Sequence, residues 1–444
     1  MRVRGAGLAL FAATALSSGL SHAADSAARS DRYQLIGAAD FSLIHANSEL
    51  DSWLYNGNGK LRYDEDHDGF RVNRIFIDFT GRIAPTLAGR FVASMNNDVA
   101  ETVDVTDAYL EWRPVPSSAW RFRGKLGAFY PRLSLENIDA GWSSPYALSS
   151  SVINTWIGEE LRIVGTELRV VRDLPGLTGQ QLSLEGGAFY FNDPTGASLT
   201  WRGWAAHDRQ TGVFGSIPMP TVSTIEPWAP SGNPVPNYEP YKEIDHRPGF
   251  YAGAQWRWGE RALIKAFHYN NHADPEAKSG NEYAWRTHFT HVGAQFALPL
   301  GFGLLGQWID GTTVMGPDLG PWRVQDVMFD STYAMLTRNF GAHRFSVRYE
   351  WFDLQPYNDP PGITNQDKGN AVAVAWMYNL SPRFRVGAEY LQIASDHCKQ
   401  DSCIWVFNGL PQKTRDSQVQ LSVRWQFFGA ASHGSTRPQS GPSL

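Results

Sequence analysis

The chain has 444 residues, of which 39 are basic and 44 are acidic, so its formal net charge is -5. This modest acidic excess argues against nucleic acid as a partner, because phosphate backbones are bound by clustered Lys and Arg. Aromatic residues make up 13% and charged residues only 19%, and there are 42 glycines, which together favour strands and turns. After residue 23 no run of about 18 apolar residues occurs, so we expect no membrane-spanning helix.

The first 23 residues have the pattern of a secretory signal peptide. Arg2 and Arg4 give a basic start, the apolar stretch LALFAATALSSGL follows, and Ser21, His22 and Ala23 form a small-x-small cleavage site. Cleavage before Ala24 would leave 37 basic residues (39 less these two arginines) against 44 acidic ones. We therefore expect the mature protein outside the cytoplasm.

Apolar and polar residues then alternate with a period of two in about sixteen segments, as in half-buried β-strands. These segments are 32–46, 69–83, 86–96, 103–113, 119–130, 160–172, 180–191, 249–258, 261–270, 285–298, 301–310, 328–339, 342–353, 370–380, 383–394 and 417–428.

The connections between these segments alternate between short and long. The short ones contain turn formers: IAPTL, PVPSS, DLPGLTG, WGE, PLG, FGA and LSP. The long ones are 47–68, 131–159, 192–248, 271–284, 311–327, 354–369 and 395–416, with a smaller one at 97–102. Outer-membrane barrels have short periplasmic turns and long extracellular loops, whereas a two-sheet sandwich has no reason to place every long loop at one end. The sequence therefore predicts an all-β protein, a transmembrane antiparallel β-barrel of about 16 strands over residues 24–428.

The two faces of single strands fit this barrel. In 342–353 the apolar residues Phe345, Val347, Tyr349 and Trp351 alternate with polar ones, and in 383–394 and 119–130 arginines share one face. The apolar face would meet lipid and the charged face an aqueous lumen. Aromatic residues at strand ends suit the two membrane interfaces.

Two loops carry patterns of their own. The stretch DEDHDG at 64–69 resembles the first half of a calcium-binding loop, but Ile75 stands where the twelfth ligand would be, so a solvated acidic loop is the simpler interpretation. The long loop 192–248 is rich in Pro, Trp and Gly and can pack over the barrel mouth, against another subunit, or extend into solvent.

The only two cysteines, Cys398 and Cys403, are separated by four residues. In an oxidising compartment this spacing predicts a small disulfide loop, with free thiols or a metal pair as alternatives. His397 is the only histidine nearby, so a closed zinc site lacks ligands, and we expect no bound metal.

The last predicted strand, 417–428, reads SQVQLSVRWQFF. We expect Val419, Leu421, Val423, Trp425 and Phe427 to face lipid, and the strand to pair with the first one and so close the barrel. The remaining residues, 429–444, are rich in Gly, Ser and Pro and are expected to form a disordered tail.

One region also resembles a known family. The segments GFRVNRIFIDFTGRI, DAYLEWRP and RFRGKLGAFYPRLSLEN, within roughly residues 69–170, resemble the early strands and third loop of the phosphate-selective porins. The resemblance implies a bacterial outer-membrane porin, assembly as a homotrimer, and a loop 131–159 that folds into the barrel and narrows it. It also implies anion selectivity from lumenal basic residues, here Arg74, Arg121, Arg123 and Lys125. The sequence departs from the family in having Glu111, Glu185, Glu350 and Glu389 on lumenal faces and no lysine cluster.

These considerations predict pore-lining residues of both signs. The basic candidates are Arg121, Arg123, Lys125, Arg162, Arg344, Arg348, Arg385 and Arg424, with Arg90, Arg169 and Arg383 as further lumenal residues. The acidic candidates in the folded-in loop and its end are Glu136, Asp139, Glu159 and Glu160. Opposed charges of this kind would set up a transverse field that orients polar solutes. The alternative is that they are ordinary solvated charges near the barrel rim.

The leading hypothesis is a passive channel, with no cofactor, whose partners are outer-membrane lipid and small hydrophilic solutes. A second hypothesis is a plugged barrel that binds an external ligand or has a structural role. A third, an outer-membrane hydrolase, has little support, because no G-x-S-x-G or HExxH motif occurs and no serine is evident as a partner for His268, His288 or His291. We therefore predict no catalytic residues.

Overall fold

The computed structural model of the chain describes residues 32–55, 57–96, 102–219, 237–357, 366–397 and 409–429. The predicted signal peptide, the predicted disulfide between Cys398 and Cys403, and the predicted tail beyond residue 429 lie outside these residues and stay predictions. None of the helices in the described ranges is long and apolar enough to cross a membrane.

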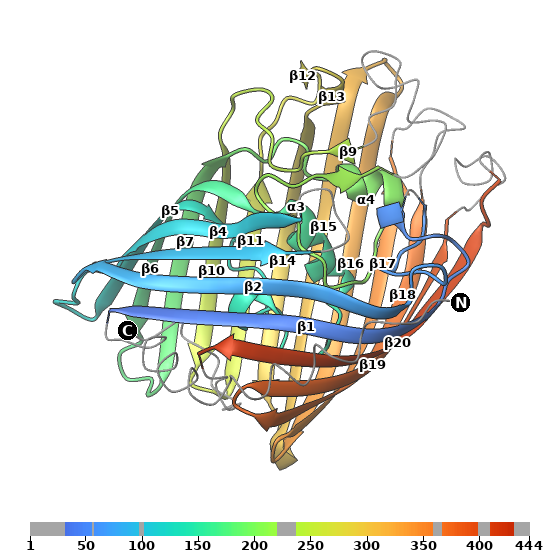
Figure 1. Cartoon of the computed structure of the whole chain (residues 1–444). Helices are drawn as coiled ribbons and strands as arrows, with labels where there is room; N and C mark the ends of the chain where they lie inside the picture. The colour runs from blue at the N-terminus through green and yellow to red at the C-terminus, as the bar shows by residue number, and fades with distance from the viewer. Residues whose placement is uncertain are drawn as a thin grey trace.

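Sixteen antiparallel strands of the described chain form one closed barrel, as the alternating pattern predicts. Each strand pairs with its neighbour in the chain, and Figure 1 shows them as a continuous wall. The barrel strands are β1 (Tyr33–Asn47), β2 (Gly69–Ala84), β3 (Leu87–Met95), β4 (Val103–Trp112), β5 (Trp120–Phe129), β6 (Ile163–Asp173), β7 (Gln180–Tyr190), β10 (Gly249–Trp258), β11 (Ala262–Asn270), β14 (Trp285–Ala297), β15 (Phe302–Asp318), β16 (Arg323–Phe340), β17 (His343–Pro356), β18 (Asp367–Ser381), β19 (Phe384–Asp396) and β20 (Lys413–Phe428).

The first and last strands close the ring. β1 pairs antiparallel with β20, with Asp40 opposite Arg424 and Leu43 opposite Leu421. This pairing gives the two terminal strands the hydrogen-bond partners that an open sheet edge would lack.

All short turns lie at one end of the barrel and all longer loops at the other. Two of the turns depend on a left-handed residue: Gly259 between β10 and β11 has φ 50°, and Gly341 between β16 and β17 has φ 60°. Glycine adopts such angles at little steric cost, which permits the tight reversal.

The main difference from the predicted strands concerns β15 and β16. We expect these strands to end at residue 310 and begin at residue 328, but the pairing continues as far as Asp318 and Arg323. Met315 and Val324 in this extension pack in a buried apolar cluster with Trp201 and Trp53 from two loops, which stabilises the extra length. The wall is therefore tall at β15–β17 and low at β3–β5.

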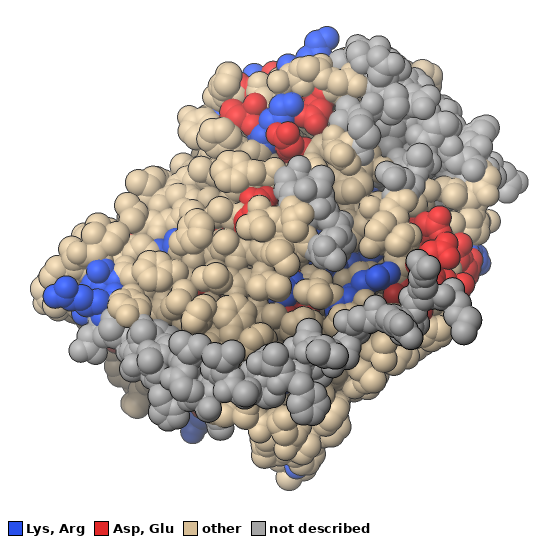
Figure 2. Space-filling model, in the orientation of Figure 1, with Lys and Arg blue, Asp and Glu red and all other residues tan. Residues whose placement is uncertain are grey.

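The outer face of the barrel is apolar, as predicted. On β20, Val419, Leu421, Val423 and Trp425 are each at least 40% exposed, whereas Gln420 between them is buried on the inner face. The same alternation holds on β17. In Figure 2 most of the face in view consists of uncharged side chains, and the largest groups of charged ones lie towards its edges. An exposed apolar belt that encircles a closed barrel is stable in contact with lipid, so we treat the barrel as membrane-spanning.

The remaining elements belong to the connections. They are η1 (Trp53–Tyr55), η2 (Ala140–Trp142), α3 (Val152–Glu160), α4 (Ala197–Arg202), η4 (Pro299–Gly301), the pair β8 (Ile217–Pro218) and β9 (Asn237–Tyr238), and the pair β12 (Lys278–Ser279) and β13 (Glu282–Tyr283). Helix α3 begins after Ser151, whose hydroxyl accepts a hydrogen bond from the Asn154 backbone N–H, a typical N-cap. Every residue of α3 is buried, because the helix lies inside the ring of strands.

The apolar outer face gives a direct test. Leu421→Arg places a charge in the middle of the lipid-facing side of β20 and should lower the free energy of unfolding in lipid vesicles by about 2–4 kcal/mol. Urea titration of the vesicle-inserted barrel measures this, with Leu421→Ile as the control that keeps the face apolar. A loss within about 0.5 kcal/mol, as for an ordinary surface substitution, would contradict the lipid-facing assignment.

Candidate functional site

Three connections from the long-loop end fold into the barrel and occupy much of its interior: residues 48–68, 130–162 and 191–219. Most described residues of the second and third are buried. Side chains of the barrel wall accept hydrogen bonds from backbone N–H groups of these loops. Gln307 accepts from Leu135 at 2.9 Å. Glu350 accepts from Val152 at 2.7 Å, and Asp367 accepts from Trp204 at 2.9 Å. The loop 131–159 does fold inward, as the family resemblance implies.

One half of the interior is filled by an apolar core. Trp156 of α3 lies with its ring centroid 5.5 Å from that of Phe289 and 5.2 Å from that of Phe329, both on the wall. Burying one such side chain removes roughly 150–250 Å² from water, about 4–6 kcal/mol. The other members of this core from the loop include Leu133, Leu135, Val152, Ile153 and Ile157, and those from β7 to β19 include Phe189, Tyr251, Phe267, Tyr269, Leu305, Ile309, Phe352 and Leu354. No solute can pass through this half.

A buried arginine fixes the loop to β17. Arg348 bonds to Glu136 of the loop and, at 2.7 Å, to Glu350 of its own strand, and it also donates to the backbone carbonyls of Ser149 and Ser150 at 3.0 Å each. Glu389 of β19 accepts from the N–H groups of Leu148 and Ser149. These charge-assisted bonds position the loop tip inside the barrel.

A second buried group joins the two inserted loops. Glu159 pairs with Arg202 of α4 at 2.6 Å and with His207 at 3.2 Å. Although burial acts in the opposite direction, these two partners hold the pKa of Glu159 well below its ordinary value. Glu160 accepts from the N–H groups of Gly196 and Ser198 at the start of α4, and burial raises its pKa.

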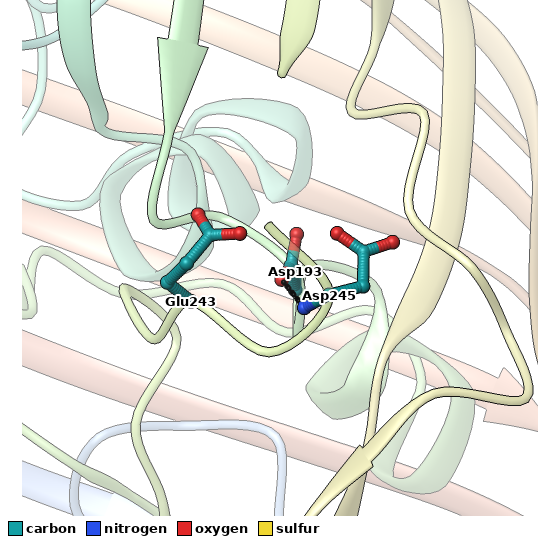
Figure 3. Close-up of side chains that lie close together, drawn as sticks. All are labelled: Asp193, Glu243 and Asp245. Atoms are coloured by element: carbon teal, nitrogen blue, oxygen red, sulfur yellow. Dashed lines mark hydrogen bonds between the residues drawn. The ribbon is translucent and has the colours of Figure 1, made fainter. Parts of the chain in front are cut away.

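Three carboxylates gather nearer the barrel mouth. Asp193, Glu243 and Asp245 have ligand oxygens within 4.8 Å of one another (Figure 3), the only such group of potential metal ligands among the described residues. Asp193 accepts from the backbone N–H groups of Ile244 and Asp245, so it ties the two ends of the loop 191–248 together. Burial raises the pKa of Asp193 to about 7, and the two neighbouring carboxylates act in the same direction.

The other half of the interior is polar. Four charged residues lie directly opposite one another across β19, β20, β1 and β2, in the order Arg385, Arg424, Asp40, Arg74. We call these residues the charged row. Arg424 makes a bidentate pair with Asp40, with distances of 2.6 and 2.8 Å.

The inserted loop meets this row with polar groups. Arg385 Nη1 donates to the Asp139 carboxylate at 3.1 Å, Arg424 Nη1 to the Ser143 hydroxyl at 2.8 Å, and Arg74 Nη1 to the Gly141 carbonyl at 2.8 Å. The loop tip is therefore attached to β19, β20 and β2 as well as to β17.

A cavity of about 530 Å³, counted with the solvent into which it opens, lies between the charged row and the inserted loops. It is lined by Asp40, Asn73, Arg74, Asn137, Trp142, Ser143, Ser144, Ala147, Leu148, Ser150, Asp208, Gln210, Met377, Arg385, Gly387, Gln420, Ser422 and Arg424. Two of these side chains, Arg74 and Gln210, are buried. Each has one polar atom without a hydrogen-bond partner in the described structure, Nε of Arg74 and Oε1 of Gln210.

A second positively charged region lies towards the short-turn end, which we call the basic vestibule: Arg123 of β5, Arg132, Arg169 of β6, Arg257 of β10 and Lys265 of β11. Glu185 is 3.7 Å from Arg169, and Lys265 donates to the backbone carbonyls of residues 132 and 133. The vestibule charges lie within electrostatic range of one another. Within the described ranges, the side chains of Arg123, Arg132 and Arg257 make no hydrogen bond or ion pair, so their charge is available to mobile anions.

The structure distributes the predicted pore residues over these regions. Arg385 and Arg424 line the cavity, and Asp139 borders it. Arg123 belongs to the vestibule, with Lys125 beside it on the same face of β5, 3.4 Å from Glu167, and Arg121 pairs with Asp173 near the turn. Arg344 is half-buried and donates to the Pro145 carbonyl of the inserted loop at 2.9 Å. The remaining predicted residues are buried in contacts with or within the inserted loops: Arg348, Glu136, Arg162, Glu159 and Glu160.

Sequence reasoning missed most of the residues that line the cavity, among them Asp40, Asp208 and Gln210. Asp40 could have been found, because a carboxylate in the middle of the first strand indicates a side chain that faces the lumen. Asp208 and Gln210 lie in a loop without a repeating apolar–polar pattern, so the sequence does not indicate which way their side chains point. The calcium-like stretch is used locally: Asp64 is buried and bonds to the Ser52 N–H at 2.7 Å and to His67 at 2.7 Å. The strand histidines bond to neighbours on the wall: His268 to Thr290, His288 to Thr312 and His291 to Gln307.

No protein-family model matches the chain, and neither does any curated protein sequence. Solved structures of similar architecture include the anion-selective porin from Comamonas acidovorans, with a TM-score of 0.49 and 12% identity over 89% of this chain and 99% of that one. The outer membrane channel DcaP of Acinetobacter baumannii (TM-score 0.48, 12% identity, 89% and 96%) and OmpF of Salmonella typhi (0.48, 12%, 89% and 97%) also match. At such identities the likeness concerns the fold alone.

Removing the buried arginine should loosen the inserted loop. Arg348→Gln leaves Glu136 and Glu350 without their cation, which costs about 3–5 kcal/mol for a buried pair. Hydrogen exchange of the Ser149–Val152 amides measures the local loss. The triple variant Arg348→Met, Glu136→Gln, Glu350→Gln removes all three charges and should recover much of the protection; equal loss in both variants would contradict this account.

The pKa of Asp193 predicts how the loop 191–248 responds to pH. A carboxyl whose pKa is about 7 in the folded protein and about 4 when unfolded stabilises the fold below pH 4, and this contribution is lost as the pH rises through 7. The protection factors of the Ile244 and Asp245 amides should fall by up to about tenfold per pH unit in this window. Asp193→Asn keeps the acceptor without the charge and should flatten the profile; an unchanged profile would contradict the assignment.

Proposed function

We propose that the protein is an outer-membrane porin through which small hydrophilic solutes diffuse passively, with a preference for anions. The observation that carries the proposal is the polar half of the barrel interior, where the charged row and the cavity lie beside an otherwise filled lumen. A water-filled path along this wall would be narrow and lined by fixed charges, and such a path selects solutes by size and charge.

The preference for anions rests on the basic vestibule. Its unpaired Arg123, Arg132 and Arg257 would raise the local concentration of anions on the short-turn side before they reach the cavity. In the proposed orientation this side faces the periplasm and the long loops face outwards, as in other outer-membrane barrels. Phosphate is one candidate solute, by resemblance of residues 69–170 to the phosphate-selective porins, but the vestibule contains one lysine rather than a lysine cluster.

Assembly as a homotrimer is part of the proposal. The wall is low at β3–β5, and the outward side chains there include Phe91, Leu110, Trp112, Phe122 and Leu126. A low apolar wall of this kind suits contact between neighbouring barrels.

A closed barrel with a binding or structural role is the second candidate. It is favoured by the attachment of the loop 130–162 to distant parts of the wall, through Gln307 of β15 on one side and Arg74 of β2 on the other. The two candidates differ in conductance, because a closed barrel carries no ions.

Planar-bilayer recording of the full-length protein tests the channel. We expect stepwise conductance, in groups of three steps for a homotrimer, and a reversal potential in a salt gradient that indicates anion preference. Arg123→Gln, Arg132→Gln and Arg257→Gln together should lower the anion-to-cation permeability ratio most strongly at low salt, where charges are least screened.

The control for this triple variant is Arg261→Gln, which removes an arginine that lies over Trp258 at the turn between β10 and β11. This control should leave the ratio unchanged. Absence of stepwise conductance would refute the channel, and a ratio unaffected by the triple variant would refute the role of the vestibule.

A further inference from the structure

The cavity beside the charged row has the chemistry of a binding site for one class of solute. We propose that it binds a small hydroxylated monocarboxylate, such as a sugar acid, whose carboxylate takes the place of Asp139 on Arg385. This inference rests on the proposed function, since it names the solute class that the polar half of the lumen selects.

The first argument is that a carboxylate already occupies the site. Asp139 comes from the inserted loop, and its carboxylate accepts from Arg385 at 3.1 Å. A solute carboxylate can therefore exchange for it with similar geometry, and the released loop side chain can turn towards solvent, because Asp139 is 29% exposed. Its neighbour Arg424 makes three bonds, to Asp40 and Ser143, whereas Arg385 makes one, to Asp139, and so keeps more of its donors for a solute.

The second argument concerns the groups around that arginine. The cavity is lined by Ser143, Ser144, Asn137 and Gln210, which bond to hydroxyl groups rather than to apolar chains. Gln210 Oε1 has no hydrogen-bond partner in the described structure and can accept a hydrogen bond from a hydroxyl group of the solute. One carboxylate oxygen of Asp208 pairs with Arg62 at 2.8 Å, and its second oxygen can accept from another hydroxyl. A buried polar atom without a partner is costly, which favours a ligand or water there.

The third argument concerns charge and size. Arg74 and Arg385 face Asp139 and the already paired Asp40, so a single negative charge that displaces Asp139 leaves the charge balance of the row unchanged, whereas a multiply charged anion would meet Asp40 and Asp208. The cavity opens to solvent on one side, so a bound molecule can extend beyond its enclosed part. The combination favours a monoanion that carries several hydroxyls.

Isothermal titration calorimetry of the folded full-length protein tests the site with gluconate as the probe. Gluconate should bind saturably, while sorbitol, which has the hydroxyls without the carboxylate, butyrate, which has the carboxylate without the hydroxyls, and inorganic phosphate should bind at least about tenfold more weakly. In a conducting bilayer, gluconate should also reduce the chloride current in a concentration-dependent way.

Two variants separate the proposed contact from a general loss of structure. Arg385→Gln should weaken gluconate binding by about tenfold or more, the loss expected for a charge-assisted hydrogen bond. Asp139→Asn removes the competing carboxylate and should tighten binding, a gain that mere damage to the fold cannot produce. The matched control Arg338→Gln changes an arginine that lies over Phe302 and Phe340 and should have no effect.

The outcomes distinguish this inference from the proposed function. Conductance without gluconate binding, phosphate binding as strong as that of gluconate, or unchanged affinity in Asp139→Asn would overturn the inference and leave the channel standing. Gluconate binding that strengthens in Asp139→Asn, in a protein that shows no conductance, would support the site and overturn the channel.

Discussion

The pairing of β1 with β20 is the constraint on which the rest of the structure depends. Backbone N–H and C=O groups exposed to lipid find no partner there, so a sheet in a membrane has to close on itself. Closure fixes the inner and outer face of every strand at once, because side chains alternate with a period of two. The apolar belt outside and the charged row inside are two consequences of this one register.

Closure also creates an interior that is too wide to be filled by strand side chains alone. The inserted loops fill it, and they bring backbone groups that need partners. Glu350, Glu389 and Gln307 of the wall accept hydrogen bonds from loop N–H groups, and Arg348 donates to loop carbonyls. Polar residues in this lumen thus serve two purposes: some hold the loops, and others remain for solutes.

Because polar lumenal residues can either hold the loops or line the open space, the sequence could predict the strands better than the role of each polar residue. The ends of most strands could be predicted to within a few residues, because the alternation of apolar and polar residues is a local property of the chain. The exceptions are β15 and β16, whose extension beyond the predicted ends depends on packing against Trp201 and Trp53 from distant loops. Glu136, Glu159 and Glu160 have the residue type of pore acids, and only the tertiary structure shows them buried against Arg348, Arg202 and the start of α4. The apolar residues Val152, Ile153, Trp156 and Ile157, in a loop expected near water, were the available signal that this segment is buried.

The division of the interior into an apolar and a polar half follows from where the loop is anchored. Its aromatic side chains pack on β7 to β19, so what remains of the lumen is the wall formed by β19, β20, β1 and β2. These strands meet at the seam that closes the barrel, and their charges lie opposite one another because the seam fixes their register. The same backbone pairing that makes the barrel stable in lipid therefore also determines the spacing of Arg385, Arg424 and Arg74 along the wall of the cavity. A one-residue change of register at the seam would move these side chains to the lipid face, so the charges of the cavity and the stability of the barrel cannot vary independently there.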